Sequence, residues 1–334
     1  MNKHRRAWQI VMMLLGLGAL IGLIAWYGFK DIGSAFAQAG WGVLWVSLFH
    51  FIPIGCDAMG WRQLFRSEVR RRVGAKRLFL YRWIGESVNN LLPVGQVGGD
   101  VVRARLASKA GAPTDRAGAA TVVDFTIGLL TQMFLALVAL GFLAARTGLN
   151  GWVGWLLLGI LVFSALIGAF LAAQIWGWFG RTGEAASRLL KGLSRRTAHQ
   201  VADESEAIDE RIEDVYGRRR SLALAATWRL GSWTVGSVEI LLALYFLGQS
   251  VGFVRAFTIH ALTMAIRSIA FIIPAGLAAQ EGGFILIGQM LGLDGPTALA
   301  LGLIRRVREI LLGVPGLIVW WTMETRRAAA HRAA

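Results

Sequence analysis

The sequence predicts an all-α integral membrane protein in which six transmembrane helices and two re-entrant helical hairpins form an inverted repeat. Composition is the first reason, because 55% of the 334 residues are hydrophobic and only 16% are charged, whereas about 25% are charged in an ordinary soluble domain. The second reason is the distribution of the basic residues, and the third is a pair of apolar stretches broken by proline and glycine. A single cysteine, Cys56, excludes a disulfide scaffold.

Six apolar stretches reach the length of about 20 residues that a helix needs to cross the hydrocarbon core of a bilayer. Tryptophan or tyrosine stands at the ends of several of them, as in the aromatic belts found at membrane interfaces. The predicted spans are Trp8–Tyr27, Trp41–Trp61, Ala119–Ala145, Trp152–Phe179, Ser221–Leu247 and Thr297–Thr322.

The basic residues predict the orientation of these spans. If the chain starts in the cytoplasm and alternates sides, 27 of the 35 lysines and arginines lie on the cytoplasmic side, three lie outside and five lie within apolar stretches. Cytoplasmic loops are enriched in such residues, so both termini are predicted to be cytoplasmic. This topology accounts for the net charge of +15, and no nucleic-acid partner is predicted.

Two further apolar segments, 78–102 and 253–293, are interrupted midway by proline and glycine. The charge count places both flanks of the first segment on the cytoplasmic side and both flanks of the second outside, so each is predicted to enter and leave by one face. Irregular backbone at membrane depth is tolerated only where protein or a water-filled cavity surrounds it, and paired broken helices form the binding sites of many transporters. The two hairpins therefore predict a binding site.

The two halves of the chain match at an offset of 181 residues, in opposite topology. We predict a single membrane domain, 1–334, made of a first repeat (1–147) and a second repeat (148–334) that includes a cytoplasmic loop (181–220). The matched pairs are Pro93 and Pro274, Gly95 and Gly276, Asp100 and Glu281, Glu86 and Arg267, and Asp124 and Arg305, with Asp57 and Glu239 at an offset of 182.

Ionisable side chains within spans cost about 2.5–3.5 kcal/mol each on insertion scales, so each needs a partner or a wet cavity. A two-fold axis between the repeats predicts the ion pairs Glu86–Arg267 and Asp124–Arg305. These pairs either hold the two halves together or line a polar path, in which the arginines bind a phosphate.

The candidate substrate-binding residues are ionisable residues at depth and residues beside the breaks. The asparagines either contact substrate or cap broken helix ends, and the glycine pairs at 98–99 and 282–283 either contact a ligand or allow tight packing. Arg305 and Arg308 are expected on one helix face, while another arginine pairs with Glu309 or extends to the interface. The set is Asn89, Asn90, Pro93, Asp100, Arg103, Asp124, Glu239, Arg267, Pro274, Glu281, Arg305 and Arg308.

The cytoplasmic loop 181–220 contains an acidic run flanked by arginines. Its apolar residues Val201, Ile208, Ile212 and Val215 have the spacing of an amphipathic helix. The loop is therefore either such a helix on the membrane surface or a solvated charged linker.

No catalytic motif occurs in the chain. The five histidines are scattered, and there is no HExxH, Walker or Gly-x-Ser-x-Gly element. We predict no catalytic residue, no metal and no cofactor, and a transporter-like protein rather than an enzyme.

Several short elements are shared with a known family. They are Asn89-Asn90-Leu91-Leu92-Pro93, Gly98-Gly99-Asp100 with Arg103, the following span at Asp124, Pro274-Ala275-Gly276 with Glu281, and the arginine of the last span. Through these elements the chain resembles the lysylphosphatidylglycerol synthase transmembrane-region family of flippase-like membrane domains. Within that family it is most similar to the stand-alone member associated with hopanoid biosynthesis.

The resemblance implies a bacterial inner-membrane protein that moves or handles a membrane lipid, isoprenoid or phospholipid, with lipid-biosynthesis enzymes as partners. No soluble aminoacyl-transferase domain follows Trp321, so lysyl-lipid synthesis is not expected. The alternatives are a membrane-embedded lipid transferase, an accessory subunit of one, and a structural scaffold.

Overall fold

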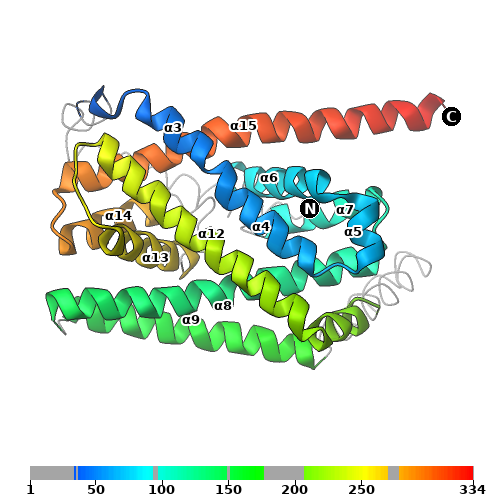
Figure 1. Ribbon diagram of the computed structural model, residues 1–334, viewed down its shortest axis with the longest axis horizontal. Helices are drawn as coiled ribbons and strands as arrows, with labels where there is room; N and C mark the ends of the chain where they lie inside the picture. The colour runs from blue at the N-terminus through cyan, green and yellow to red at the C-terminus, as the bar shows by residue number, and fades with distance from the viewer. Residues whose placement is uncertain are drawn as a thin grey trace, which may run out of the picture.

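The computed structural model describes Ser34 and residues 37–92, 97–148, 151–176, 207–269 and 278–333, with side chains up to Arg326. Its regular structure in these ranges is entirely helical, which confirms the all-α class (Figure 1). The helices are α3 (Gly42–Phe49), α4 (Phe51–Gln63), α5 (Ser67–Val73), α6 (Ala75–Leu91), α7 (Gly98–Lys109), α8 (Thr114–Thr147), α9 (Gly151–Ile175), α12 (Arg219–Phe246), α13 (Phe253–Ile269), α14 (Ala279–Met290) and α15 (Gly295–Ala333).

Three helices among the described residues are long and apolar enough to cross a membrane. They are Gly42–Gln63, in which α4 continues α3, together with α8 and α9. Each coincides with a predicted span. The helices α12 and α15 cover two more predicted spans, but arginines and glutamates interrupt their apolar character. The predicted span Trp8–Tyr27 lies outside the described residues, so the number six stays a prediction.

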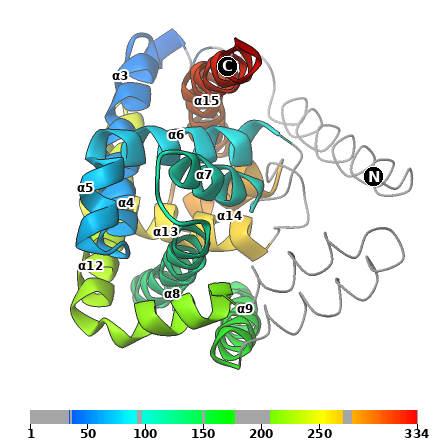
Figure 2. The same cartoon turned by 90° about the vertical axis from the view of Figure 1, so that its right-hand side faces the viewer.

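Two pairs of short helices, α6 with α7 and α13 with α14, lie at the two predicted hairpins. None of the four reaches the 20 or so residues needed for a crossing. The first pair occupies the half of the molecule that contains α5, and the second pair occupies the other half (Figure 1). Viewed along the long axis, both pairs lie between α4 with α12, α8 with α9, and α15 (Figure 2). The breaks themselves, with Pro93 and Pro274, lie outside the described residues.

Glycine permits the close approach of α6 and α7. A Cβ atom on Gly99 would lie 1.8 Å from the carbonyl oxygen of Gly85, so no larger residue fits there. In the second pair, a Cβ on Gly283 would lie 3.1 Å from the Thr263 side chain, whereas a Cβ on Gly282 would meet no atom within 4 Å. Tight packing therefore accounts for Gly99 and, less strictly, for Gly283.

Contacts between helices occur in matching pairs. α4 packs on α6 as α12 packs on α13, and α7 packs on α8 as α14 packs on α15. Likewise α6 contacts α15 as α13 contacts α8, while α4 and α12 pack directly on each other. These contacts in one half thus have counterparts in the other half, and the inverted repeat itself stays a prediction.

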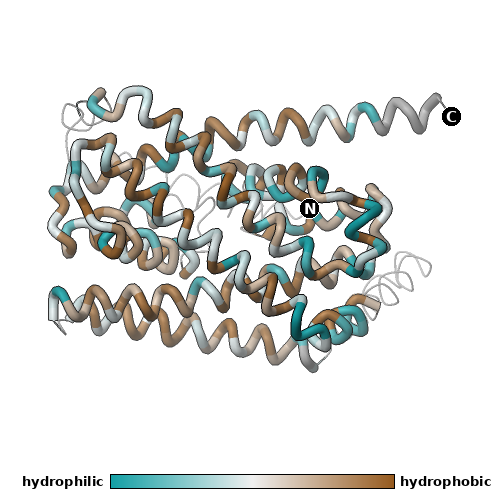
Figure 3. The backbone as a smooth tube through the Cα atoms, in the orientation of Figure 1, coloured by the Kyte–Doolittle hydropathy of each residue, from teal (hydrophilic) through white to brown (hydrophobic). Residues whose placement is uncertain are grey.

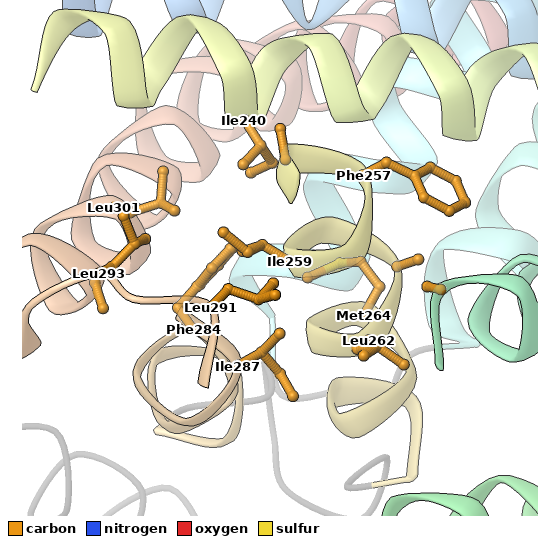
Figure 4. Packing of buried hydrophobic residues seen from close by; sticks show 14 of the residues in the cluster. Ile240, Phe257, Ile259, Leu262, Met264, Phe284, Ile287, Leu291, Leu293 and Leu301 are labelled. Carbon is orange, nitrogen blue, oxygen red and sulfur yellow. The ribbon is translucent and has the colours of Figure 1, made fainter. Parts of the chain in front are cut away.

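Two hydrophobic clusters pack the two ends of the molecule. Because lipid tails are as apolar as leucine, such clusters stabilise a membrane protein through van der Waals packing more than through removal from water. Along α12, Ala225 belongs to one cluster and Ile240 to the other, and Arg229 and Glu239 lie between them. The cluster in Figure 4 includes Ile240, Phe257, Ile259, Phe284 and Leu301; the other includes Trp61, Leu78, Tyr81, Leu106 and Val123.

Residues 207–217 are helical, and their apolar side packs against the protein. Ile212 and Val215 are buried in the cluster that contains Trp61, and Ile208 packs against it. The predicted amphipathic helix is therefore confirmed over 207–217, but its apolar side faces the protein instead of a membrane, and a solvated linker is wrong for this segment; Val201 lies outside the described residues. Hydrophilic residues gather near this segment and α5, and hydrophobic ones follow α8 and α9 (Figure 3).

Candidate functional site

Six side chains, five of them buried and the sixth, Arg82, 15% exposed, form a closed ring in which aspartate and arginine alternate. We call it the charge ring. It joins α4, α6, α7, α8 and α12, so it fixes five helices at one level. Its contacts are Asp57–Arg82 (2.7 Å), Arg82–Asp100 (4.0 Å), Asp100–Arg103 (2.7 Å), Arg103–Asp124 (2.8 Å), Asp124–Arg229 (2.9 Å) and Arg229–Asp57 (2.8 Å).

The charge ring is electrically neutral, with three carboxylates and three guanidinium groups. Arg103 is fully buried and also lies over the Trp61 ring, 4.6 Å from its centroid. The sequence count places Arg82 and Arg103 in a cytoplasmic segment; in the structure both belong to the ring, and this side of the membrane stays a prediction. A neutral buried network avoids the cost of an unpaired charge away from water.

A second network is centred on α15 and contains four glutamates, three arginines and His50. We call it the glutamate cluster. Arg306 pairs with Glu309, as expected for one arginine of this helix. The contacts are His50–Glu86 (2.7 Å), His50–Glu239 (2.7 Å), Arg308–His50 (2.6 Å), Arg308–Glu239 (2.9 Å), Arg308–Glu309 (3.7 Å), Arg267–Glu309 (2.8 Å), Arg306–Glu309 (2.8 Å) and Arg306–Glu281 (2.9 Å).

Arg305 differs from every arginine of the two networks, because it forms no ion pair within the described part of the chain. Its Nη1 donates to Nδ1 of His260 at 2.9 Å, and its guanidinium lies 5.9 Å from the ring centroid of Phe284. An arginine can only donate, so Nδ1 of His260 must accept. The imidazole is therefore neutral, and no carboxylate of the described residues contacts Arg305 directly.

A polar chamber of about 240 Å³ lies between the two networks. Both asparagines of the first predicted break contribute to its wall, and so does Arg305. The lining residues that carry charge or titrate are His50, Asp57, Arg82, Glu86, Arg229, Glu239, His260, Arg267 and Arg305.

The chamber continues into an apolar groove of about 500 Å³ between α8 and α9. The two cavities share Arg82, Asn89, Gln132, Arg229, Trp233 and Ser268, which form the polar end of the groove. Further along, its walls are apolar, formed by Phe125, Leu129, Phe163, Leu166, Ile167 and Phe170. A third cavity of about 300 Å³ shares Phe163 and Leu166 with the groove and extends it past Trp155 and Leu158 of α9. The combined space is polar at one end and apolar at the other.

Comparison with known proteins decides the family. The family model described as lysylphosphatidylglycerol synthase TM region matches residues 13–316. The chain belongs to this family. It is also similar to a UPF0104 membrane protein of Methanothermobacter thermautotrophicus, with 23% identity over 98% of this chain and 95% of that protein. No solved structure matches the chain.

The two asparagines that precede the first predicted break form hydrogen bonds to other helices. Asn89 Oδ1 accepts a hydrogen bond from the backbone N–H of Gly99 at 2.7 Å, so it caps the start of α7 from the end of α6. Asn90 Oδ1 accepts from Arg267 at 2.9 Å and so links the two hairpins. Both side chains also line the chamber, so the structural and the ligand-contacting interpretations describe the same residues.

The other predicted site residues take different positions. Glu239, Arg267 and Arg305 line the chamber, and Asp100 lines the groove. Arg103 and Asp124 belong to the charge ring. Glu281 and Arg308 lie behind the chamber wall within the glutamate cluster, and Pro93 and Pro274 lie outside the described residues.

Both ion pairs predicted from the repeat are wrong. Asp124 binds Arg103 and Arg229, while Arg305 binds His260. Glu86 binds His50, while Arg267 binds Glu309, Gln280 and Asn90. At these two pairs, the equivalent positions of the repeats do not contact each other.

The candidate set omitted six charged or titratable residues of the chamber: His50, Asp57, Arg82, Glu86, Arg229 and His260. Asp57 and Glu86 had been matched through the repeat, and His50 and Arg229 each interrupt an apolar stretch that was predicted to span the membrane. Among the described residues, no group of three or more histidine, cysteine or acidic side chains is placed to hold a metal ion.

Proposed function

We propose that this membrane protein binds an amphiphilic lipid with an anionic head group in the chamber and its tails in the groove, and moves the lipid across the bilayer. One observation carries the proposal: a buried arginine without a carboxylate partner, Arg305, lines a polar chamber that continues into an apolar groove. Membership of a family named after a phospholipid synthase supports a lipid as the substrate.

The charge of Arg305 favours a phosphate in the head group. A buried cation without a counter-ion is costly, and a phosphate oxygen would supply the missing negative charge. Guanidinium binds phosphate through paired, charge-assisted hydrogen bonds. Arg267 lines the same chamber, but Glu309 already neutralises it. Arg305 is therefore the principal contact of the head group. Arg308 does not line the chamber and acts indirectly, by neutralising Glu239 in the chamber wall.

The groove fits hydrocarbon tails because its apolar walls reach the outer surface of the molecule. Leu166 and Trp155 are 56% and 70% exposed and both line the extended groove. In a bilayer these side chains would face lipid, so tails could enter from the side while the head group enters the chamber.

The two helix pairs are the proposed moving parts. We take α6–α7 and α13–α14 as re-entrant hairpins of an inverted repeat in a bacterial inner membrane, with both termini in the cytoplasm. Paired discontinuous helices that meet at a central site are characteristic of alternating-access transporters, and the matching helix contacts support this arrangement. An isoprenoid lipid of hopanoid biosynthesis is the narrower proposal, supported by the sequence resemblance.

Reconstituted protein tests the proposal. Vesicles of phosphatidylcholine containing a trace of head-group-labelled fluorescent phosphatidylglycerol are treated with dithionite, which bleaches only the outer leaflet. If the protein moves lipid, bleaching proceeds beyond the outer-leaflet pool. Arg305→Gln should abolish this excess, whereas Arg146→Gln, which removes the same charge from an exposed position of α8, should not.

A second matched pair tests the groove. Leu166→Trp would fill it, whereas Leu161→Trp changes a residue of α9 that is 54% exposed and does not line it. Slower transport in Leu166→Trp alone supports the proposal. Bleaching confined to the outer leaflet with the native protein would contradict it, and a covalently altered lipid in the vesicles would indicate the lipid transferase instead.

A further inference from the structure

We propose that a second path for the lipid head group leads out of the chamber between α6 and α15, and that this path is closed in the present structure. The inference rests on the proposed function and on the sequence offset between the two repeats. It supplies the exit that lipid movement requires, because a chamber with one opening can bind a lipid but cannot pass it to the other leaflet.

A cavity of about 10 Å³, the space of roughly one water molecule, marks this path. It lies between Trp83 and Ser87 of α6 and Leu312 and Gly313 of α15, and we call it the α6–α15 crevice. The crevice adjoins the chamber, with which it shares the residues His50, Ile54, Glu86 and Asn90. A head group in the chamber therefore already touches the inner wall of the crevice.

The offset between the repeats relates the crevice to the junction of the chamber and the groove. Residues that line the crevice have equivalents in the other repeat that line the chamber, the groove or both. The pairs are Trp83 and Met264, Glu86 and Arg267, Ser87 and Ser268, and Gln132 and Gly313 at an offset of 181, with His50 and Ser232 and Ile54 and Gly236 at 182. The crevice thus has, in one repeat, the position that the open junction has in the other.

Glycine closes the crevice. A Cβ on Gly313 would lie 2.6 Å from Cδ1 of Leu91, and a Cβ on Gly316 would overlap Oγ of Ser87. The backbone of α15 therefore packs directly against side chains of α6. Trp83 Nε1 also donates to the carbonyl oxygen of Leu312 at 3.0 Å, which links the two helices at the same level.

Glutamine occupies the position equivalent to Gly313 on the open side. Gln132 of α8 reaches across to α13, where its Nε2 donates to the carbonyl oxygen of Met264 at 2.8 Å and to Oγ of Ser268 at 2.7 Å. Its side chain spans the distance between the two helices, and it lines both the chamber and the groove. One helix pair is thus in direct contact, whereas its equivalent is joined through a long polar side chain.

The crevice offers surroundings for a head group and for tails. The residues that it shares with the chamber include a histidine, a glutamate and an asparagine, which can contact a polar group. Beside it, α15 carries apolar side chains that are 44–55% exposed, at Ile310, Leu311, Val314 and Ile318. Ile310 is the equivalent of Leu129, which lines the groove. An opened crevice would therefore be polar inside and apolar outside, as the groove is.

The helix α15 can bend at the crevice. Pro315 stands inside this helix between Gly313 and Gly316, and proline removes one backbone hydrogen bond, so helices bend at such positions. Bending here would break the contact between Trp83 and Leu312 and separate α15 from α6. Because inverted repeats are related by an axis in the membrane plane, the crevice and the groove would open to opposite leaflets.

Two equivalent serines can report which path is open. Ser87→Cys and Ser268→Cys are made separately with Cys56→Ser, which removes the native thiol. Each full-length protein is solubilised in detergent with phosphatidylcholine and treated with a small water-soluble methanethiosulfonate reagent. Ser87→Cys should react about 10- to 1,000-fold more slowly than Ser268→Cys, as expected for an open state that is about 0.1–10% populated. Phosphatidylglycerol should accelerate the reaction of Ser87→Cys by about tenfold or more.

An exchange at the equivalent positions tests what keeps the two paths different. Gly313→Gln introduces on α15 the side chain that spans the open junction, so Ser87→Cys should react rapidly even without phosphatidylglycerol. Gly141→Gln on α8, where a Cβ would meet no atom within 4 Å, should leave that reaction slow. If Gly313→Gln fails to fold, the two cysteine variants without it decide alone.

The outcomes separate the two proposals. Protection of Ser87→Cys with both lipids, together with lipid movement in vesicles, would overturn the second path and leave the proposed function standing. Equal reaction rates of the two cysteines before phosphatidylglycerol is added would also overturn it, because the crevice would then be open at rest. Absence of lipid movement by the native protein would remove the proposed function and the second path with it.

Discussion

Arg305 and Arg308 lie three residues apart on α15 and are both buried, yet only Arg308 contacts a carboxylate. Arg308 donates to Glu239 at 2.9 Å, whereas Arg305 donates to the neutral ring of His260. The same residue type on one helix therefore has two roles, one that neutralises a buried acid and one that leaves a positive charge facing the chamber.

This difference predicts opposite effects of one substitution at the two positions. Arg308→Gln leaves Glu239 without its arginine, and breaking a buried ion pair in this way costs about 3–5 kcal/mol. Arg305→Gln leaves no acid unpaired, so the stability should stay unchanged or rise. Thermal unfolding of both variants in the same detergent measures the difference, and equal losses of stability would contradict these roles.

A second prediction concerns the partners of Asp124 in the charge ring. Asp124→Asn leaves the ring with one excess positive charge and should cost about 3–5 kcal/mol. Adding Arg229→Gln restores neutrality and should recover part of the loss. Adding Arg305→Gln instead should recover nothing, because residues without contact contribute additively within about 0.5 kcal/mol. A double-mutant cycle on unfolding free energies distinguishes these cases, and recovery with Arg305→Gln alone would reinstate the pair expected from the repeat.

A third prediction concerns the closest helix contact of the first hairpin. Gly99→Ala places a Cβ against the Gly85 carbonyl, so α6 and α7 must separate, and the cost should exceed the roughly 1–3 kcal/mol of ordinary overpacking. Gly141→Ala on α8, where a Cβ meets no atom within 4 Å, should be neutral or stabilising by up to about 1 kcal/mol. The purification yield and the unfolding temperature of the two variants measure these effects. If Gly99→Ala proved harmless, α6 and α7 would not approach each other as closely as the structure shows.

A fourth prediction concerns pH and the helix at residues 207–217. Hydrogen bonds from the Arg66 guanidinium lower the pKa of the Asp214 carboxyl below its ordinary value. A lowered folded-state pKa contributes stability above the unfolded pKa of about 3.9, and that stability is lost as the pH falls through the folded-state pKa. The hydrogen-exchange protection factor of this helix, which compares its exchange rate with the intrinsic rate at the same pH, should therefore fall on acidification.

The control for the fourth prediction is chosen on the same helix. Asp214→Asn should accelerate exchange at neutral pH and reduce its dependence on acid. Glu213→Gln alters an exposed acid and should change neither. The effect is expected to be small because Arg66 is half exposed, and solvent weakens such pairs. An unchanged pH dependence in Asp214→Asn would assign the acid sensitivity to another group.

Helix positions followed from the sequence because length and apolar content determine them. The predicted spans Ala119–Ala145 and Trp152–Phe179 correspond to α8 and α9 within a few residues. The pairs α6–α7 and α13–α14 also lie where the two hairpins are predicted, because proline and glycine interrupt otherwise apolar segments there. These features are local, so no knowledge of helix packing was needed.

Partners of the charged residues could not be predicted in the same way. The offset of 181 identifies equivalent positions, but contacts depend on which helices pack together, and α8 meets α12 through Asp124 and Arg229. Arg82 and Arg103 lie in a basic segment whose composition indicates a cytoplasmic surface, although both turn inward. His50 was overlooked because a single polar residue in an apolar span carries little weight until its neighbours, Glu86 and Glu239, are known.

The groove between α8 and α9 has a consequence for the energetics of lipid movement. Its exposed walls would let the hydrocarbon chains stay among those of neighbouring lipids while only the head group passes through the protein. Withdrawing a chain of 16 carbons into water would cost about 13 kcal/mol at about 0.8 kcal/mol per methylene, and a sideways path avoids this entirely. The barrier that remains is electrostatic. Lipids with different tails could therefore be recognised equally well through the charge of a shared head group.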